Sequence, residues 1–340
     1  MSVIRFMPAV IRAAMVVLIT LCTFFAFGCG FNHRTNPAFA TTHDQAKEEL
    51  KDMEDNPVSL KRPVIILGGW GDPGFAPASM AKKIHKATGE NDDIITVNYF
   101  LTSSFDESAR NTVKQVEKQF PSNDPDQTVE VDVIGFSMGG LVARYAAIPP
   151  KDVGPNAHTK RLNIKNLYTV STPHQGARFA FLAAWFDSSA RDMKPNSIFL
   201  EKLDEDLKQN NRYTMIPYTR LEDMTVGEHN TYPKGYNVIW VDNRPFQAAH
   251  GGAAGDRRII ADIARRLRHE QPLAAADQPP LPTLPQSEPQ SQQAQYADAA
   301  PTLGGKSKPI SNNHPPAITS TSQTRQAPPQ DTATSSPMTN

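Results

Sequence analysis

Cysteine is nearly absent from this chain of 340 residues, which contains only Cys22 and Cys29. The sequence after residue 29 therefore offers neither a disulfide nor a cysteine ligand for a metal ion. A folded region must be stabilised by burial of its apolar core alone, which a domain of roughly 200 residues can achieve.

The chain also lacks net charge, because 35 Lys and Arg residues balance 35 Asp and Glu residues. No long basic run and no basic stripe with interleaved aromatic residues occurs, and such features mark nucleic-acid-binding surfaces. We therefore expect no nucleic-acid partner.

The N-terminus has no apolar run of the length that a bilayer span needs, which is about 20 residues. Its apolar run, 13–28, has sixteen uncharged residues and follows two basic residues, Arg5 and Arg12. A basic start before an apolar run of this length is typical of a secretory signal. The sequence predicts export, either to the cell envelope or into the medium.

Two processing sites follow this run. Ala26-Phe27-Gly28 precedes Cys29 and resembles a lipoprotein box, which predicts lipidation of Cys29 and attachment to a membrane. Ala38-Phe39-Ala40 has the small-x-small pattern of a signal-peptidase site. Cleavage after Ala40 and an uncleaved anchor are the alternatives to lipidation.

The C-terminal stretch 271–340 lacks Trp and Phe and holds 13 of the 29 prolines. Because it has little apolar bulk to bury, we expect a disordered tail. The predicted organisation is a signal or lipoprotein-like segment at 1–29, a linker at 30–55, a globular domain at 56–270 and this tail. The linker contains a short charged helix candidate near 45–54.

Between residues 56 and 270, apolar runs alternate with segments of helical periodicity. The strands are predicted at 64–67, 94–97, 129–134, 167–171, 213–218 and 238–241, and the main helices at 77–88, 104–120, 139–148 and 257–268. Continuous apolar runs suit parallel strands that are buried on both faces, and parallel strands need crossover helices. We expect an α/β fold with a mostly parallel sheet, helices on both faces and a small helical insert near 177–209.

Gly135-Phe136-Ser137-Met138-Gly139 has the pattern G-x-S-x-G between a predicted strand and a predicted helix. In this context the serine lies at a sharp turn with its hydroxyl exposed, and side chains at the glycine positions would collide with the neighbouring strand and helix. The helix N-terminus also directs backbone N–H groups at an anion that forms beside the serine. Ser137 is therefore the candidate nucleophile.

The sequence resembles the α/β-hydrolase superfamily, and within it the bacterial triacylglycerol lipases and esterases. Four stretches carry the resemblance, at 63–70, 135–140, 172–176 and 191–200. The third of these reads Thr-Pro-His-Gln-Gly and is similar to the family's T-P-H-x-G segment.

The resemblance implies the chain order serine, acid, histidine for the catalytic residues. Asp223 lies in a stretch similar to the family's acid loop, and Glu222 and Asp242 are its competitors. His250 follows the last predicted strand and is the expected base. A serine needs such a base, and the base needs an acid to orient it.

Three other histidines in the domain are not expected to transfer protons. His174 belongs to the T-P-H-Q-G segment and is expected to shape a loop near the site. His229 precedes the last strand and is expected to be exposed, and His85 lies in a helix far from the strand ends.

An oxyanion hole needs two backbone donors, which the resemblance places at the N–H groups of Trp70 and Met138. The chain has Gly68-Gly69 where many related lipases have His-Gly. This difference removes a histidine side chain from the loop, but the backbone N–H groups that would form the oxyanion hole are still present.

The insert contains a dense aromatic group that can form a lid or the wall of an acyl pocket, or simply pack on the core. Its members are Phe179, Phe181, Leu182, Trp185 and Phe186.

The sequence thus predicts a serine hydrolase that acts on an ester or lipid substrate through Ser137, His250 and Asp223. The scheme requires no cofactor and no metal. The alternatives are a thioesterase, amidase or acyltransferase that uses the same residues, and a non-catalytic envelope protein that uses the fold for binding.

Overall fold

The computed structural model describes residues 36, 39–89, 92–154, 156–178, 180, 187–244 and 247–274. Its centre is a sheet with the strand order β2-β1-β3-β4-β5-β6, in which all neighbours pair in parallel. The strands are β1 (Val64–Leu67), β2 (Ile94–Val97), β3 (Val131–Phe136), β4 (Ile164–Val170), β5 (Thr214–Arg220) and β6 (Ile239–Val241).

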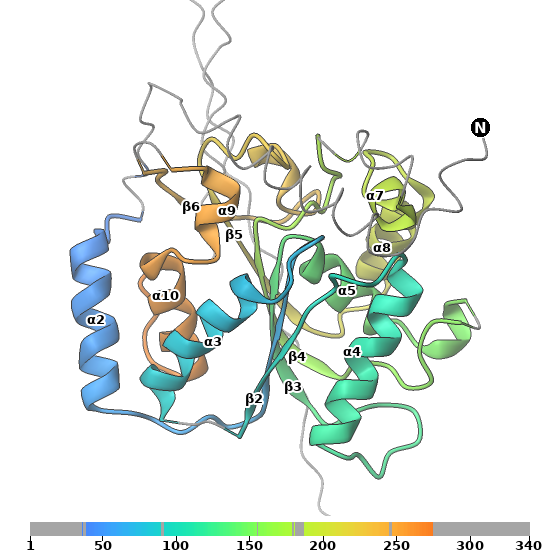
Figure 1. The fold of residues 1–340 in the computed structure, drawn as a ribbon, viewed down its shortest axis with the longest axis horizontal. Coiled ribbons are helices and arrows are strands. Elements are labelled where there is room, and N and C mark those ends of the chain that lie inside the picture. The colour runs from blue at the N-terminus through green and yellow to red at the C-terminus, as the bar shows by residue number, and fades with distance from the viewer. Residues whose placement is uncertain are drawn as a thin grey trace, which may run out of the picture. The chain divides into compact units, whose positions relative to one another are not determined.

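Helices cover both faces of the sheet, with α2, α3 and α10 on one side and α4, α5 and α8 on the other (Figure 1). The α-helices are α2 (His43–Asp55), α3 (Phe75–Thr88), α4 (Phe105–Gln119), α5 (Met138–Ala146), α7 (Ser188–Asp192), α8 (Ile198–Gln209), α9 (Ala249–Ala253) and α10 (Arg257–Leu267). Two short 3-10 helices are η2 (Pro150–Asp152) and η3 (Glu228–Asn230). The predicted fold class is confirmed.

The central strands are apolar throughout because both of their faces are buried. In β1, Val64 and Ile66 pack into the core under α3 and α10, whereas Ile65 and Leu67 pack into the core under α4 and α5. All four side chains are fully buried. Successive side chains of a strand point to opposite faces of the sheet. Because helices cover both faces here, every position of the strand is apolar, and the sequence shows a continuous apolar run.

The bounds of β1 and β2 agree with the sequence prediction, whereas β3 lies two residues further along the chain than predicted. The strand continues through Gly135, which pairs with Leu67 on one side and with Thr169 on the other. In the sequence, Gly135 indicated the end of the strand. In the structure, the strand continues to Phe136, the residue before Ser137.

The predicted linker 30–55 differs from the structure, because α2 belongs to the folded unit. Ala46 and Met53 are buried and Leu50 packs against the same core, so one stripe of α2 faces the domain. Arg265 of α10 binds Glu49 at 2.5 Å. The mostly charged composition of this helix concealed its narrow apolar stripe.

The chain upstream of α2 is also anchored. The backbone N–H of Asn36 donates to Asp242 Oδ1 at 2.5 Å, and its side-chain amide donates to the carbonyl oxygen of Trp240 at 2.9 Å. Phe39 is 4% exposed and packs into the core shared with α3 and α10. These residues hold the N-terminal segment against the carboxyl end of β6.

The folded unit also extends slightly beyond residue 270. Ala274 is buried, and its N–H donates to Asp262 Oδ1 at 2.9 Å. The predicted signal segment with Cys29, and the predicted tail from residue 275 onward, lie outside the described residues.

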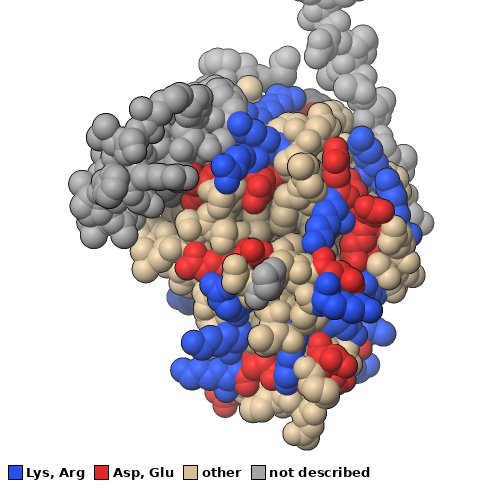
Figure 2. All heavy atoms as spheres, turned by 90° about the vertical axis from the view of Figure 1, so that its right-hand side faces the viewer, with Lys and Arg blue, Asp and Glu red and all other residues tan. Residues whose placement is uncertain are grey.

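Acidic and basic side chains are interspersed over the face that carries α4 and α8 (Figure 2). Within the described part of the chain, no helix is both long enough and apolar enough to cross a membrane.

Candidate active site

Ser137 lies at the sharp turn between β3 and α5. Its backbone has φ 52° and ψ −124°, and this positive φ is strained for a residue with a side chain. The turn is held by a hydrogen bond from the Ser137 N–H to the carbonyl of Val170 in β4, at 2.9 Å. The serine therefore occupies the start of a helix at the carboxyl edge of the sheet.

The glycines around Ser137 are needed because the backbones pack too closely for side chains. A Cβ on Gly135 would lie 2.5 Å from Gly140 Cα, and one on Gly139 would lie 2.6 Å from the carbonyl oxygen of Leu67. A Cβ on Gly140 would lie 2.2 Å from Thr172 Oγ1. These contacts fix α5 against β1 and β4.

Three distant segments bring their side chains together at this edge. His250 Nε2 lies 3.0 Å from Ser137 Oγ, and His250 Nδ1 lies 2.8 Å from Asp223 Oδ2. Asp223 follows β5, and His250 lies in α9. The ring of Phe136 lies beside the imidazole, with 5.4 Å between the centroids. The predicted serine, histidine and aspartate thus form one continuous chain of contacts.

Asp223 is a buried carboxylate that the surrounding donors keep ionised. Burial alone would raise its pKa, but His250 and the N–H of Val226 outweigh that effect, so the pKa lies below its ordinary value. The N–H groups of Thr225 and Val226 both donate to Asp223 Oδ1 at 3.1 Å. One oxygen of the carboxylate is thus held by the loop while the other faces His250.

The two competing acids point elsewhere. Glu222 accepts from Asn243 Nδ2 at 3.3 Å through Oε2, and Asp242 Oδ1 accepts from the N–H of Asn36. Glu222 also has a positive φ of 66°, which turns the chain between β5 and Asp223. Of the three candidate acids, Asp223 is the one that contacts His250.

His174 is fully buried behind the nucleophile turn. Arg144 Nη1 donates to its Nδ1 at 2.9 Å, so its Nε2 carries the proton and donates to Thr169 Oγ1 at 3.1 Å. Burial, reinforced by the charge of Arg144, holds the pKa of His174 well below its ordinary value. Arg144 also binds Asp204 of α8 at 3.0 Å, so this neutral histidine joins the T-P-H-Q-G loop to α5 and α8.

Neither His229 nor His85 contacts the nucleophile. His229 lies 3.5 Å from Glu228 and packs edge-on against the ring of Trp240. His85 lies in the last turn of α3.

The glycine-rich loop after β1 passes directly beside the serine, since a Cβ on Gly69 would lie 3.2 Å from Ser137 Cβ. Among the described residues, neither the N–H of Trp70 nor that of Met138 donates to a carbonyl oxygen. The indole of Trp70 hydrogen-bonds to the carboxylate of Asp187, the N-cap of α7, whose pKa is raised by burial despite this bond. The loop is thereby joined to the insert.

The predicted site also includes the aromatic group of the insert. The aromatic residues predicted as an acyl wall or lid, which are Phe179, Phe181, Leu182, Trp185 and Phe186, lie outside the described residues. The described part of the insert consists of α7 and α8.

Sequence reasoning missed two charged contacts behind the site. Arg144 is buried against His174, and Arg220 is buried beside Asp256 with 3.4 Å between Nε and Oδ2. Each arginine lies in an otherwise apolar helix or strand, which is the only signal that the sequence offers for them. Over the residues that the structure describes, no three His, Cys, Asp or Glu side chains are grouped to hold a metal ion.

Residues 101–194 match the family model described as PGAP1-like alpha/beta domain, which covers 94 of the 340 residues. The matched segment contains Ser137 and the T-P-H-Q-G stretch. Together with the observed sheet, it confirms the resemblance to the α/β-hydrolase superfamily at the level of the fold. No curated protein matches the chain.

Several solved structures are similar to the chain at low identity. A Bacillus licheniformis lipase, BlEst2 in its mature form, has a TM-score of 0.37 and 13% identity, covering 58% of this chain and 90% of that one. A Pyrobaculum calidifontis esterase has a TM-score of 0.39 and 12% identity, with coverages of 69% and 99%. Phospholipase PlaB from Legionella pneumophila has a TM-score of 0.34 and 13% identity, with coverages of 52% and 43%.

Proposed function

We propose that this protein is a serine hydrolase that cleaves carboxylic esters through a covalent acyl-enzyme. The observation that carries the proposal is the chain of contacts from Ser137 Oγ through the imidazole of His250 to Asp223, at 3.0 and 2.8 Å. These distances are those that a general base and its orienting acid require.

In the first half of the reaction, neutral His250 accepts the proton of Ser137 through Nε2 while Oγ attacks the ester carbonyl carbon. Asp223 holds the proton on Nδ1 and stabilises the imidazolium that forms. The negative charge that develops on the carbonyl oxygen is bound by the N–H groups of Met138 and Trp70. Loss of one such donor costs on the order of 10²–10³-fold in rate.

The first half ends when the imidazolium gives its proton to the leaving alcohol, the bond between the carbonyl carbon and the alcohol oxygen breaks, and the acyl group remains on Ser137. In the second half, His250 takes a proton from water as the water oxygen attacks the acyl carbon. The imidazolium then returns this proton to Ser137 Oγ as the bond between Oγ and the acyl group breaks and the acid leaves. The ester carbonyl lies between Ser137 and the glycine-rich loop, because Gly69 passes beside the serine. The aromatic residues of the insert are proposed to line the acyl side of the substrate.

The proposal includes export, followed by membrane attachment through a lipidated Cys29. The buried contacts of Asn36 and Phe39 support processing upstream of residue 36, because cleavage after Ala40 would remove both. The carboxylate of Asp242 and the carbonyl of Trp240 would then lose their donors. Mass spectrometry of the mature protein tests this arrangement, and a mature chain that starts at Thr41 would contradict it.

The function is tested with p-nitrophenyl esters of increasing acyl length, for the wild-type chain beside Ser137→Ala. We expect hydrolysis by the wild type and a loss of at least about 10⁴-fold in kcat for the variant. A fluorophosphonate probe should label the wild type and leave Ser137→Ala unlabelled. The dependence of kcat/KM on chain length then reports the acyl preference.

The same assay separates the other functions. A wild-type protein that is labelled but hydrolyses thioesters or amides faster than esters would be a thioesterase or an amidase. A wild-type protein that is neither labelled nor active would support a binding role for the fold. Labelling of Ser137→Ala as strong as that of the wild type would overturn the assignment of the nucleophile.

A further inference from the structure

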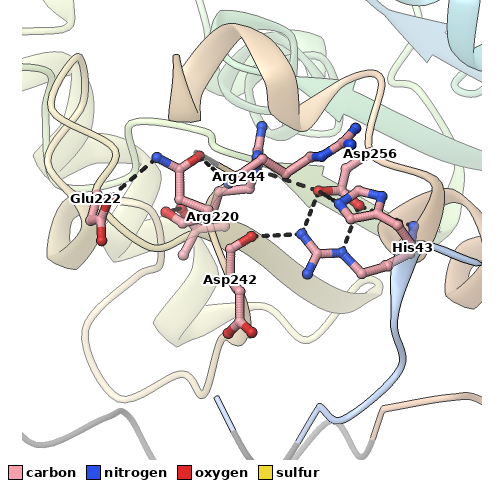
Figure 3. Close-up of polar contacts among 9 residues, drawn as sticks. His43, Arg220, Glu222, Asp242, Arg244 and Asp256 are labelled. Carbon is pink, nitrogen blue, oxygen red and sulfur yellow. Dashed lines mark hydrogen bonds and ion pairs between the residues drawn. The ribbon is translucent and has the colours of Figure 1, made fainter. Parts of the chain in front are cut away.

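Arg220 is a buried cation at the end of the strand that leads to the acid loop. It is the last residue of β5, three positions before Asp223, and its side chain is completely buried. Its Nε lies 3.4 Å from Oδ2 of Asp256, the N-cap of α10. Figure 3 shows Arg220 and His43 approaching the carboxylate of Asp256 from different elements.

The charge of Arg220 is only partly compensated. Among the described residues, none of its three guanidinium nitrogens makes a hydrogen bond. Asp256 is shared with Arg258, which binds it through Nε and Nη2 at 3.0 and 2.8 Å. Burial lowers the pKa of Arg220 to about 10 against the attraction of Asp256, so the group is still charged at neutral pH. A buried cation with few partners acts on its neighbours over a longer range than a solvated one.

The guanidinium of Arg220 packs directly under α9, the helix that carries His250. A Cβ on Gly252 would lie only 2.0 Å from Arg220 Nη1, so the helix backbone rests on the guanidinium at this point. Gly252 is two residues from His250 and is held by a hydrogen bond to the carbonyl of Ala248, at 2.9 Å. A side chain at residue 252 would separate α9 from the end of β5.

We propose that Arg220 is a positioning residue that fixes α9 over the acid loop and holds a positive charge behind the His250–Asp223 pair. The inference rests on the proposed function, since it assigns His250 the role of the base. The contact keeps the imidazole between Ser137 and Asp223, and the buried charge contributes to the electrostatic field at the pair.

The charged groups of the region come from several elements. His250 faces Asp223 from the loop after β5, and Arg220 lies at the end of β5 itself. Arg220 is in turn influenced by Asp256 and Arg258 of α10, and by Arg244 from the segment after β6. Loss of Arg220 would leave Asp256 bound to Arg258 and would remove the positive charge at the end of β5.

The test compares Arg220→Met, which keeps the length but loses the charge, with Arg220→Lys, which keeps the charge. The first readout is kcat/KM for p-nitrophenyl butyrate across pH. We expect Arg220→Met to shift the acid limb of the profile upward by about half to one pH unit, and Arg220→Lys to restore most of the shift. The second readout is hydrogen exchange in the segment 247–255, which should become at least about tenfold faster in Arg220→Met.

Arg62→Met is the control, because Arg62 forms a partly buried ion pair, with Asp132 at 3.0 Å, at the opposite end of the sheet. We expect this control to melt at a lower temperature with an unchanged acid limb and unchanged exchange in 247–255. If Arg220→Met does not fold, Gly252→Ala tests the same contact from the helix side, with faster exchange in 247–255 expected.

An acid limb that stays in place in Arg220→Met would overturn the proposal. A wild-type protein that hydrolyses no ester would instead refute the proposed function. The exchange measurement would then decide the inference, because it requires no activity: unchanged exchange in 247–255 would overturn it and faster exchange would support it.

Discussion

His250 Nε2 lies 3.0 Å from Ser137 Oγ, although 113 positions separate the two residues in the chain. The parallel sheet makes this possible, because both residues follow strands that end at the same edge. The backbone conformation of Ser137 directs its hydroxyl toward the imidazole, and the short helix α9 presents the imidazole from the other side.

Two substitutions can show that Asp223, and not the neighbouring Glu222, is the acid that orients His250. We expect Asp223→Asn to lower kcat by on the order of 10³–10⁴-fold, because an amide cannot hold the same imidazole tautomer or stabilise its charged form. Glu222→Gln is the matched control, since this side chain contacts Asn243 instead, and it should retain activity within about threefold. Equal losses in the two variants would contradict the assignment.

Gly140→Ala is expected to destabilise the protein by about 1–3 kcal/mol through overpacking. The new methyl group would lie 2.2 Å from Thr172 Oγ1, so α5 or the T-P-H-Q-G loop would have to shift. Urea unfolding measures the loss, and Thr172→Ala in the same chain should recover part of it. A Gly140→Ala protein as stable as the wild type would show that the two segments are not in close contact.

Phe39→Ala tests whether the N-terminal segment belongs to the fold. Because Phe39 is buried against the core under α3 and α10, its truncation should cost about 3–4 kcal/mol of unfolding free energy. Val58→Ala is the control, since Val58 is 41% exposed and its truncation should cost less than about 0.5 kcal/mol. Equal stability of Phe39→Ala and wild type would mean that the segment is not docked.

Stability is expected to fall as the pH drops from 6.5 toward 4. Burial lowers the pKa of His43 from 6.5 to about 4, although the attraction of Asp256 opposes this effect. Between pH 6.5 and 4 the ring is therefore neutral in the folded state, whereas the unfolded chain binds a proton there, and this difference favours unfolding. His43→Gln should therefore flatten the dependence of Tm on pH in this window. Burial also lowers the pKa of His174, so part of the slope should persist. Parallel curves for the two proteins would contradict the role of His43.

Much of the fold and the candidate site could be predicted because their signals are local. The apolar runs of β1 and β2 predict buried parallel strands, and the glycines around Ser137 predict a turn too crowded for side chains. Other features depend on distant partners. The apolar stripe of α2 becomes apparent only against α3 and α10, and the burial of Arg220 requires Asp256 and Gly252 to meet it. A single sequence does not contain these pairings.

The anchoring of Asn36 beside β6 limits how far the domain can move from any lipid on Cys29. Seven positions separate the two residues, and a fully extended chain spans at most about 3.6 Å per residue, or about 25 Å in all. The anchor lies at the carboxyl edge of the sheet, which is also the edge that bears Ser137. If Cys29 is acylated, Asn36 would therefore stay within about 25 Å of the lipid attachment point.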